Sequence, residues 1–246
     1  MKTKVWAHRG ASGYMPENTL PSFQKAVELG ADGVELDIQL SKDGEIVVCH
    51  DEMVDRTSNA KGWLKDYTLA ELKEMDFSYQ FKELGKVSIP TMKEVFELLK
   101  PTNLIINIEL KTGIFDYEGI EEKIIALTHA EGFEDRVIYS SFNHYSIMKI
   151  QELDPNAKTA FLYSDGPLDM PLYGYEHHVN ALHPAAYNLR LPDFMEECNV
   201  YHLDVNVWTV NTEEIALMCL KYGVITLITN YPDRIKKVIE QYETGI

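Results

Sequence analysis

Short apolar runs alternate with helical patterns along nearly the whole chain of 246 residues. No linker or change of composition interrupts this succession. The expected strands are residues 4–7, 33–39, 104–110, 137–140, 159–162, 181–182, 206–210 and 226–229, with residues 46–49 counted as a continuation of the second strand. About eight strand-helix units without a break favour an α/β fold with one closed parallel barrel, the TIM (β/α)8 barrel, over a doubly wound sheet.

One stretch departs from the alternation. Residues 51–88 are polar, contain Gly62 and Gly85, and include one short helix that begins with a capping box of Thr68 and Glu71. We interpret this stretch as a small insertion after the second strand, within a single domain that covers residues 1–246. The other expected helices begin near residues 20, 92, 118, 145, 212 and 233.

The composition of the chain disfavours two classes of partner, nucleic acids and membranes. The formal net charge of -16 disfavours nucleic acid and stable membrane association, because both reward clustered Lys and Arg. No stretch approaches about 18 apolar residues, and the first residues lack the apolar core of a signal peptide, so a cytoplasmic protein is expected. The three cysteines form no zinc or CxxC pattern and suit structural thiols in a reducing compartment. The oligomeric state stays open, with a homodimer among the options.

Reactive side chains gather where the first strands are expected to end. They are His8 and Arg9 after the first strand, Glu35 and Asp37 in the second half of the second, His50 after residues 46–49, and Glu109 and Lys111 at the close of the third. Residues two apart in a strand point to the same face, and a TIM barrel collects its functional groups at the C-terminal ends of its strands. These side chains are therefore expected to converge on one mouth.

Three carboxylates in this set suggest a metal site. Glu35, Asp37 and Glu109 offer only oxygen ligands, which suit one hard divalent cation, Mg²⁺ or Ca²⁺. Without a cation, ionised carboxylates in a barrel mouth would repel one another. The alternative is that they form ion pairs with Arg9 and Lys111. A cation is also needed if the substrate is a phosphodiester, because the acidic chain must then supply positive charge locally.

The two histidines of the set suggest acid-base chemistry. His8 and His50 come from different strands, so they could lie on opposite sides of a substrate phosphorus, one as general base and the other as general acid. The alternative is an ordinary structural role, which their position beside carboxylates makes less attractive. Arg9 and Lys111 could bind the phosphate oxygens.

Other candidates carry weaker signals. Phe142 follows the fourth strand and Trp208 lies within the seventh, so both could wall the pocket, although core packing explains a barrel aromatic equally well. His183, just before Pro184 near the end of an expected strand, could line the pocket, but a place in a loop is favoured. Asn18 and Thr19 are both expected to offer N-caps to the helix that begins near residue 20.

A set of short motifs follows in a fixed order along the chain. They are His8-Arg9-Gly10, Pro16-Glu17-Asn18-Thr19, Gly30-Ala31-Asp32, Glu35-Leu36-Asp37, Lys42-Asp43-Gly44, His50-Asp51, Arg56-Thr57, Ile89-Pro90-Thr91, Glu109-Leu110-Lys111 and Trp208-Thr209-Val210-Asn211. This ordered set resembles the glycerophosphodiester phosphodiesterase family, and the resemblance spans residues 4–233.

The resemblance implies a TIM barrel with a small insertion after the second strand. It implies hydrolysis of a small-molecule glycerophosphodiester, such as glycerophosphocholine or glycerophosphoethanolamine, to glycerol 3-phosphate and an alcohol. By resemblance, His8 and His50 are the acid and base, in an order that stays open. The remaining roles that it implies are a Mg²⁺ or Ca²⁺ site at Glu35, Asp37 and Glu109, and phosphate binding at Arg9 and Lys111.

Two other functions compete with this one. A phospholipase that acts on intact lipid would need an apolar or basic docking patch, which the acidic composition does not favour. A noncatalytic barrel that binds a phosphorylated polyol would have little need of two histidines placed for proton transfer.

Overall fold

The computed structural model describes residues 2–245, and its parallel strands close into a barrel. β1 pairs with both β2 and β9, which joins the two edges of the sheet. The eight parallel strands are β1 (Lys4–His8), β2 (Gly33–Leu40), β4 (Ile105–Leu110), β5 (Val137–Ser141), β6 (Lys158–Tyr163), β7 (Ala181–Pro184), β8 (Asp204–Val207) and β9 (Thr226–Thr229). The predicted TIM barrel is confirmed.

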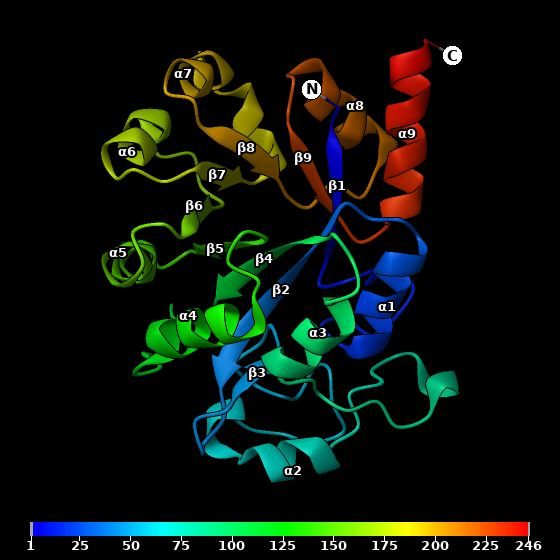
Figure 1. Ribbon diagram of the computed structural model, residues 1–246. Coiled ribbons are helices and arrows are strands. Elements are labelled where there is room, and N and C mark those ends of the chain that lie inside the picture. The colour runs from blue at the N-terminus through cyan, green and yellow to red at the C-terminus, as the bar shows by residue number, and fades with distance from the viewer. Residues whose placement is uncertain (1, 246) are drawn as a thin grey trace.

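Helices cover the outside of the barrel and bury its outward-facing apolar side chains (Figure 1). They are α1 (Leu20–Glu28), α3 (Met92–Leu99), α4 (Ile120–Glu131), α5 (His144–Leu153), α6 (Met170–Glu176), α7 (Phe194–Val200), α8 (Glu213–Lys221) and α9 (Pro232–Thr244). A separate, smaller cluster that includes Trp6, Ile138 and Ile228 fills the inside of the barrel. No helix among residues 2–245 is long and apolar enough to cross a membrane.

The prediction for residues 46–49 is wrong. β3 (Ile46–Val48) does not continue β2 but runs antiparallel to it, with Ile38 opposite Val48. Gly44, at a φ of 81°, lies in the turn that reverses the chain between the two strands. The hairpin brings the chain back to the barrel mouth, where the backbone N–H of Cys49 donates to the carbonyl of Asp37 at 3.0 Å. His50 therefore enters the site from a loop after a hairpin strand.

Residues 51–88, expected as an insertion, lie between β3 and α3 and have a small core of their own. This core contains Val54, Leu64, Leu72 and Phe77, and it packs separately from the main barrel core. The segment holds α2 (Leu69–Glu74) and two 3-10 helices, Leu64–Asp66 and Lys82–Leu84. Figure 1 shows α2 beyond β3, on the far side from the helices α6 and α7.

Three helical segments between the later strands were not predicted from the sequence. α6 contains Pro171 and Gly174, which weaken a helical pattern, and a 3-10 helix Ala186–Arg190 precedes the short helix α7. Each of these segments is too short to show a helical period clearly. The missed helices complete the expected succession of strands and helices rather than altering it.

Candidate active site

The side chains expected to converge do so at one mouth of the barrel. His8, Arg9, Glu35, His50 and Glu109 line a single cavity of about 190 Å³. Asp37 and Lys111 adjoin it, since the Nζ of Lys111 lies 2.9 Å from Glu109 and 3.2 Å from the Nε2 of His50. The other wall of this cavity is apolar and consists of Phe142, Leu162, Trp208 and Ile228.

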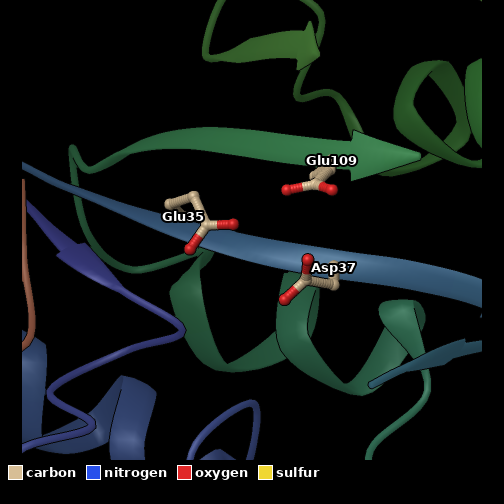
Figure 2. Close-up of side chains that lie close together, drawn as sticks. All are labelled: Glu35, Asp37 and Glu109. Carbon is tan, nitrogen blue, oxygen red and sulfur yellow. The ribbon is translucent and has the colours of Figure 1, made fainter. Parts of the chain in front are cut away.

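The three acidic side chains come from two neighbouring strands. Asp37 of β2 pairs with Glu109 of β4 in the sheet register, and Glu35 lies two residues before Asp37 on the same face. One oxygen from each residue lies within 4.8 Å of the other two, and all three residues are buried. Figure 2 shows the three carboxylates around a common space between the strands.

The three buried carboxylates need positive charge nearby if all of them are to be ionised. Burial, and then the charges of Asp37 and Glu109, raise the pKa of Glu35 well above its usual range. Burial and Asp37 also raise the pKa of Glu109. Although burial would raise the pKa of Asp37 as well, His50, Arg9 and Lys111 hold it below its usual range. Oδ1 of Asp37 is buried without a hydrogen-bond partner among the described residues. An all-oxygen triad with an unpartnered carboxylate oxygen fits a hard divalent cation.

Two residues of the loop after β1 fix this triad. The backbone N–H of Arg9 donates to Glu35 at 2.9 Å, and the side-chain amide of Asn18 donates to Asp37 at 2.8 Å. Both residues have a positive φ, 55° for Arg9 and 56° for Asn18. Of the two residues expected to cap α1, Thr19 occupies the N-cap position and Asn18 does not. Asn18 instead orients a carboxylate of the site.

Each histidine is anchored through its Nδ1 atom. The Nδ1 of His8 lies 2.7 Å from the amide oxygen of Asn230, and the Nδ1 of His50 lies 2.6 Å from Asp51. Because these oxygens accept hydrogen bonds, Nδ1 is the donor in both pairs, and Nε2 carries the lone pair in the neutral rings. The Nε2 of His50 lies 3.2 Å from the Nζ of Lys111. Nε2 of His8 lies 3.9 Å from Glu35. Burial, and then Arg9, lower the pKa of His8 to about 4, so its ring is neutral at neutral pH.

The two cations of the site are paired with carboxylates in this structure. Lys111 contacts Glu109 at 2.9 Å, and Arg9 contacts Glu17 at 2.9 Å and Asp37 at 3.6 Å. The ion pairs that the sequence offered as the alternative to a metal site are therefore present in the structure. Arg9 lines the cavity and Lys111 adjoins it, so their charges also reach the space where a phosphate would lie.

The aromatic candidates form one corner of the cavity. The rings of Phe142 and Trp208 meet edge to face, with centroids 5.7 Å apart at 85°. Trp208 follows β8 and does not lie within it, and its indole N–H donates to the carbonyl of His183. His183 lies in β7 and not in the loop where it was expected. It is fully buried, and its Nε2 lies 2.8 Å from the amide nitrogen of Asn206. Pro184 ends that strand and was a misleading loop signal.

Sequence reasoning assigned no role to several residues that the structure places in or behind the site. Asn107, two residues before Glu109 on β4, lines the cavity with its amide oxygen unpartnered. Asn230 and Asp51 anchor the two histidines. The alternation of β4 could have identified Asn107, and the position just after β9 could have identified Asn230. Glu17 and Arg56 complete the surroundings of Asp51.

Fold and site together define a class: a TIM-barrel hydrolase with an acidic triad and two anchored histidines at the C-terminal ends of its strands. Residues 8–234 match the Glycerophosphoryl diester phosphodiesterase family. The chain belongs to this family of phosphoric diester hydrolases, which confirms the resemblance stated above.

Relatives and solved structures agree with this membership. A glycerophosphodiester phosphodiesterase of Caldanaerobacter subterraneus is 43% identical over 98% of this chain and 99% of its own length. One of Bacillus altitudinis is 41% identical over 97% and 99%. A phosphodiesterase of Oleispira antarctica, solved in complex with the product sn-glycerol-3-phosphate, matches with a TM-score of 0.86, 29% identity, and 97% coverage of both chains.

Proposed function

We propose that this enzyme hydrolyses glycerophosphodiesters, such as glycerophosphocholine and glycerophosphoethanolamine, to glycerol 3-phosphate and the free alcohol. The observation that carries the proposal is the meeting of two Nδ1-anchored histidines and a buried acidic triad at one cavity of about 190 Å³. The Oleispira antarctica relative, which binds sn-glycerol-3-phosphate as product, supports this substrate class. A small diester suits a cavity of this size, whereas a net charge of -16 disfavours nucleic acid.

Glu35, Asp37 and Glu109 would hold one divalent cation, Mg²⁺ or Ca²⁺. When bound, the cation supplies Lewis-acid charge that stabilises the phosphate oxygens as negative charge develops on them. Arg9 and Lys111, whose side chains contact the acidic triad, would bind the same phosphate group. With these three sources of positive charge, an acidic protein can hold an anionic substrate.

The two histidines would divide the proton transfers according to their anchors. His8, neutral beside the amide of Asn230, suits the general base that takes a proton from the attacking hydroxyl. His50 donates Nδ1–H to the carboxylate of Asp51, which fixes the orientation of its ring, and it would be the acid that protonates the leaving alcohol. Phe142 and Trp208 would exclude water from the apolar side of the cavity.

The test is an assay of metal-free protein against a panel of glycerophosphodiesters, with Mg²⁺ or Ca²⁺ restored in turn. We expect release of glycerol 3-phosphate only after a cation is restored. Phosphorus NMR of the reaction mixture shows whether a cyclic phosphate forms, as attack by the glycerol 2-hydroxyl requires, or whether water attacks directly. Full activity without a cation, or hydrolysis of intact lipid in vesicles in preference to the soluble diesters, would contradict the proposal.

A further inference from the structure

The guanidinium of Arg56 lies between two carboxylates that come from distant parts of the chain. Its Nε and Nη2 donate to Asp51 at 2.6 and 3.0 Å, and its Nη1 and Nη2 donate to Glu17 at 2.7 Å each. Arg56 belongs to the insertion, whereas Glu17 belongs to the loop before α1, 39 residues away. The planar fork of an arginine is the side chain that can bind two carboxylates in this way.

Each of these carboxylates has a second partner, and both second partners line the cavity. Asp51 accepts from the Nδ1 of His50 at 2.6 Å, and Glu17 accepts from the Nη1 of Arg9 at 2.9 Å. Arg56 is absent from the residues that line the cavity. Arg56 therefore contacts the cavity only indirectly, through Asp51 and His50 on one side and through Glu17 and Arg9 on the other.

The charges of this cluster balance around Arg56. Without it, Glu17 and Asp51 would face each other as like charges next to a site for an anionic substrate. Although burial would raise the pKa of Glu17, hydrogen bonding by Arg56 and the charge of Arg9 hold it below its usual range. The hydrogen bond with His50, together with Arg56, holds the pKa of Asp51 below its usual range as well. The ring of Tyr79 covers Arg56, with its centroid 6.0 Å from Cζ.

We propose that Arg56 is a positioning residue that sets the orientation of His50 through Asp51 and that of Arg9 through Glu17. The inference rests on the proposed function, because it assigns to His50 the proton transfer and to Arg9 the phosphate. Fixing the oxygens of Asp51 fixes the proton of His50 on Nδ1 and aims Nε2 at the cavity. The same guanidinium fastens the insertion to the loop after β1, so that both sides of the mouth keep one geometry.

The first test compares Arg56→Gln and Arg56→Lys with the wild-type protein by steady-state kinetics on glycerophosphocholine. We expect Arg56→Gln to lower kcat by about 10- to 100-fold, the usual effect of removing a partner that orients a functional group. KM should rise as well, because Arg9, which binds the phosphate, loses the same support through Glu17. Arg56→Lys restores the charge but not the fork, so its kcat stays closer to that of Arg56→Gln than to wild type. The matched control is Lys86→Gln, which removes an exposed ion pair with Glu74 in the same insertion and leaves kcat unchanged.

The second test is independent of turnover. Nitrogen NMR of the full chain, recorded with the ring of His50 in its neutral form, reports which ring nitrogen carries the proton: we expect Nδ1–H in the wild type and a mixture of tautomers in Arg56→Gln. If Arg56→Gln fails to fold, Arg56→Lys and Glu17→Gln replace it, and Glu17→Gln should also lower kcat because it releases one side of the fork.

Arg56→Lys with wild-type kcat, or an Arg56 variant with an unchanged His50 tautomer, would overturn the positioning role. If the wild type hydrolyses no glycerophosphodiester, the proposed function fails, while the tautomer comparison still decides the role of Arg56.

Discussion

The two halves of the barrel mouth differ sharply in chemistry. The half built from β1, β2, β4 and the hairpin loop after β3 carries every charged group of the cavity, including Glu35, His50 and Glu109. The half built around β5, β6, β8 and β9 lines the cavity with apolar side chains, among them Phe142 and Trp208, whose rings contact each other. One closed sheet thus presents a charged side and an apolar side at the same mouth, and the proposed function assigns the reaction to the first and substrate binding to the second.

This division has a structural basis. The charged half receives loops that fix its side chains: Asn18 holds Asp37, Asn230 holds His8, and Asp51 holds His50. The apolar half is fixed by packing, and beneath it His183 and Asn206 form a buried polar pair. Substitutions in the charged half should therefore affect the chemical step, whereas those in the apolar half should affect substrate binding or stability.

The largest expected effect is the loss of a histidine from the charged half. Either His8→Ala or His50→Ala should lower kcat about 10³-fold, because each removes one proton transfer. The double variant should lose little more than either single one, since the two histidines act as a unit. The measurement is steady-state release of glycerol 3-phosphate. His129→Ala, on the outer helix α4, serves as control, and wild-type kcat in His50→Ala would break the comparison.

The next largest effect is on cation binding. Glu109→Gln keeps the size of the side chain but removes one of the three anionic ligands that we propose, so Mg²⁺ or Ca²⁺ should bind about 100-fold more weakly. Isothermal calorimetry on metal-free protein measures this change. Glu97→Gln, at an exposed position of α3, is the matched control. Equal cation affinity in Glu109→Gln and wild type would remove Glu109 from the ligand set.

A third prediction concerns the floor of the apolar half. Burial lowers the pKa of His183 to about 3 from the usual 6.5, so the folded protein does not accept a proton that the unfolded chain accepts below pH 6.5. The stability due to neutral His183 is fully present above pH 6.5 and is lost as the pH falls toward 3. Between pH 7 and 5 this loss amounts to about 2 kcal/mol, at 1.36 kcal/mol per pH unit.

Urea denaturation at the two pH values tests this sign. His183→Gln should lower the free energy of unfolding at pH 7. Between pH 7 and 5, however, the free energy of unfolding of this variant should fall by about 2 kcal/mol less than that of the wild type. The idea fails if His183→Gln and the wild type lose the same stability over this range.

The smallest effect is expected on the apolar wall. Phe142→Ala removes the ring that meets Trp208, so KM should rise about tenfold while kcat stays within about threefold. Tyr145→Ala, three residues further on and 87% exposed, is the control and should change neither constant. A fall in kcat as large as that of His8→Ala, with KM unchanged, would show that the two halves do not divide the work in this way.

The sequence predicted the barrel and the charged half well for physical reasons. Alternating apolar runs specify parallel strands, and the alternation within β2 and β4 specifies that Asp37 and Glu109 share a face. It failed where a local signal has two interpretations. Residues 46–49 follow a turn signal that suits either a continuation or a hairpin, and Pro184 suits either a loop or a strand end.

Residues that act on other side chains were also hard to predict. Asn230 reaches His8 across 222 residues of sequence, and Glu17 reaches Arg56 across 39. Such contacts depend on the closure of the barrel and on the path of the insertion, and no local pattern encodes either. Asn18 illustrates the limit, because its place before a helix suggested a cap, whereas its side chain binds Asp37.

We expect the charged half to be complete only with a cation at Glu35, Asp37 and Glu109. Titration of Mg²⁺ or Ca²⁺ into metal-free protein, with the heat of binding and the rate of glycerophosphodiester hydrolysis recorded on the same samples, tests this expectation. Activity should rise from a negligible level in proportion to the occupancy of one cation site per chain. Full hydrolysis before any cation is added, or saturation of the site without any gain in rate, would contradict it.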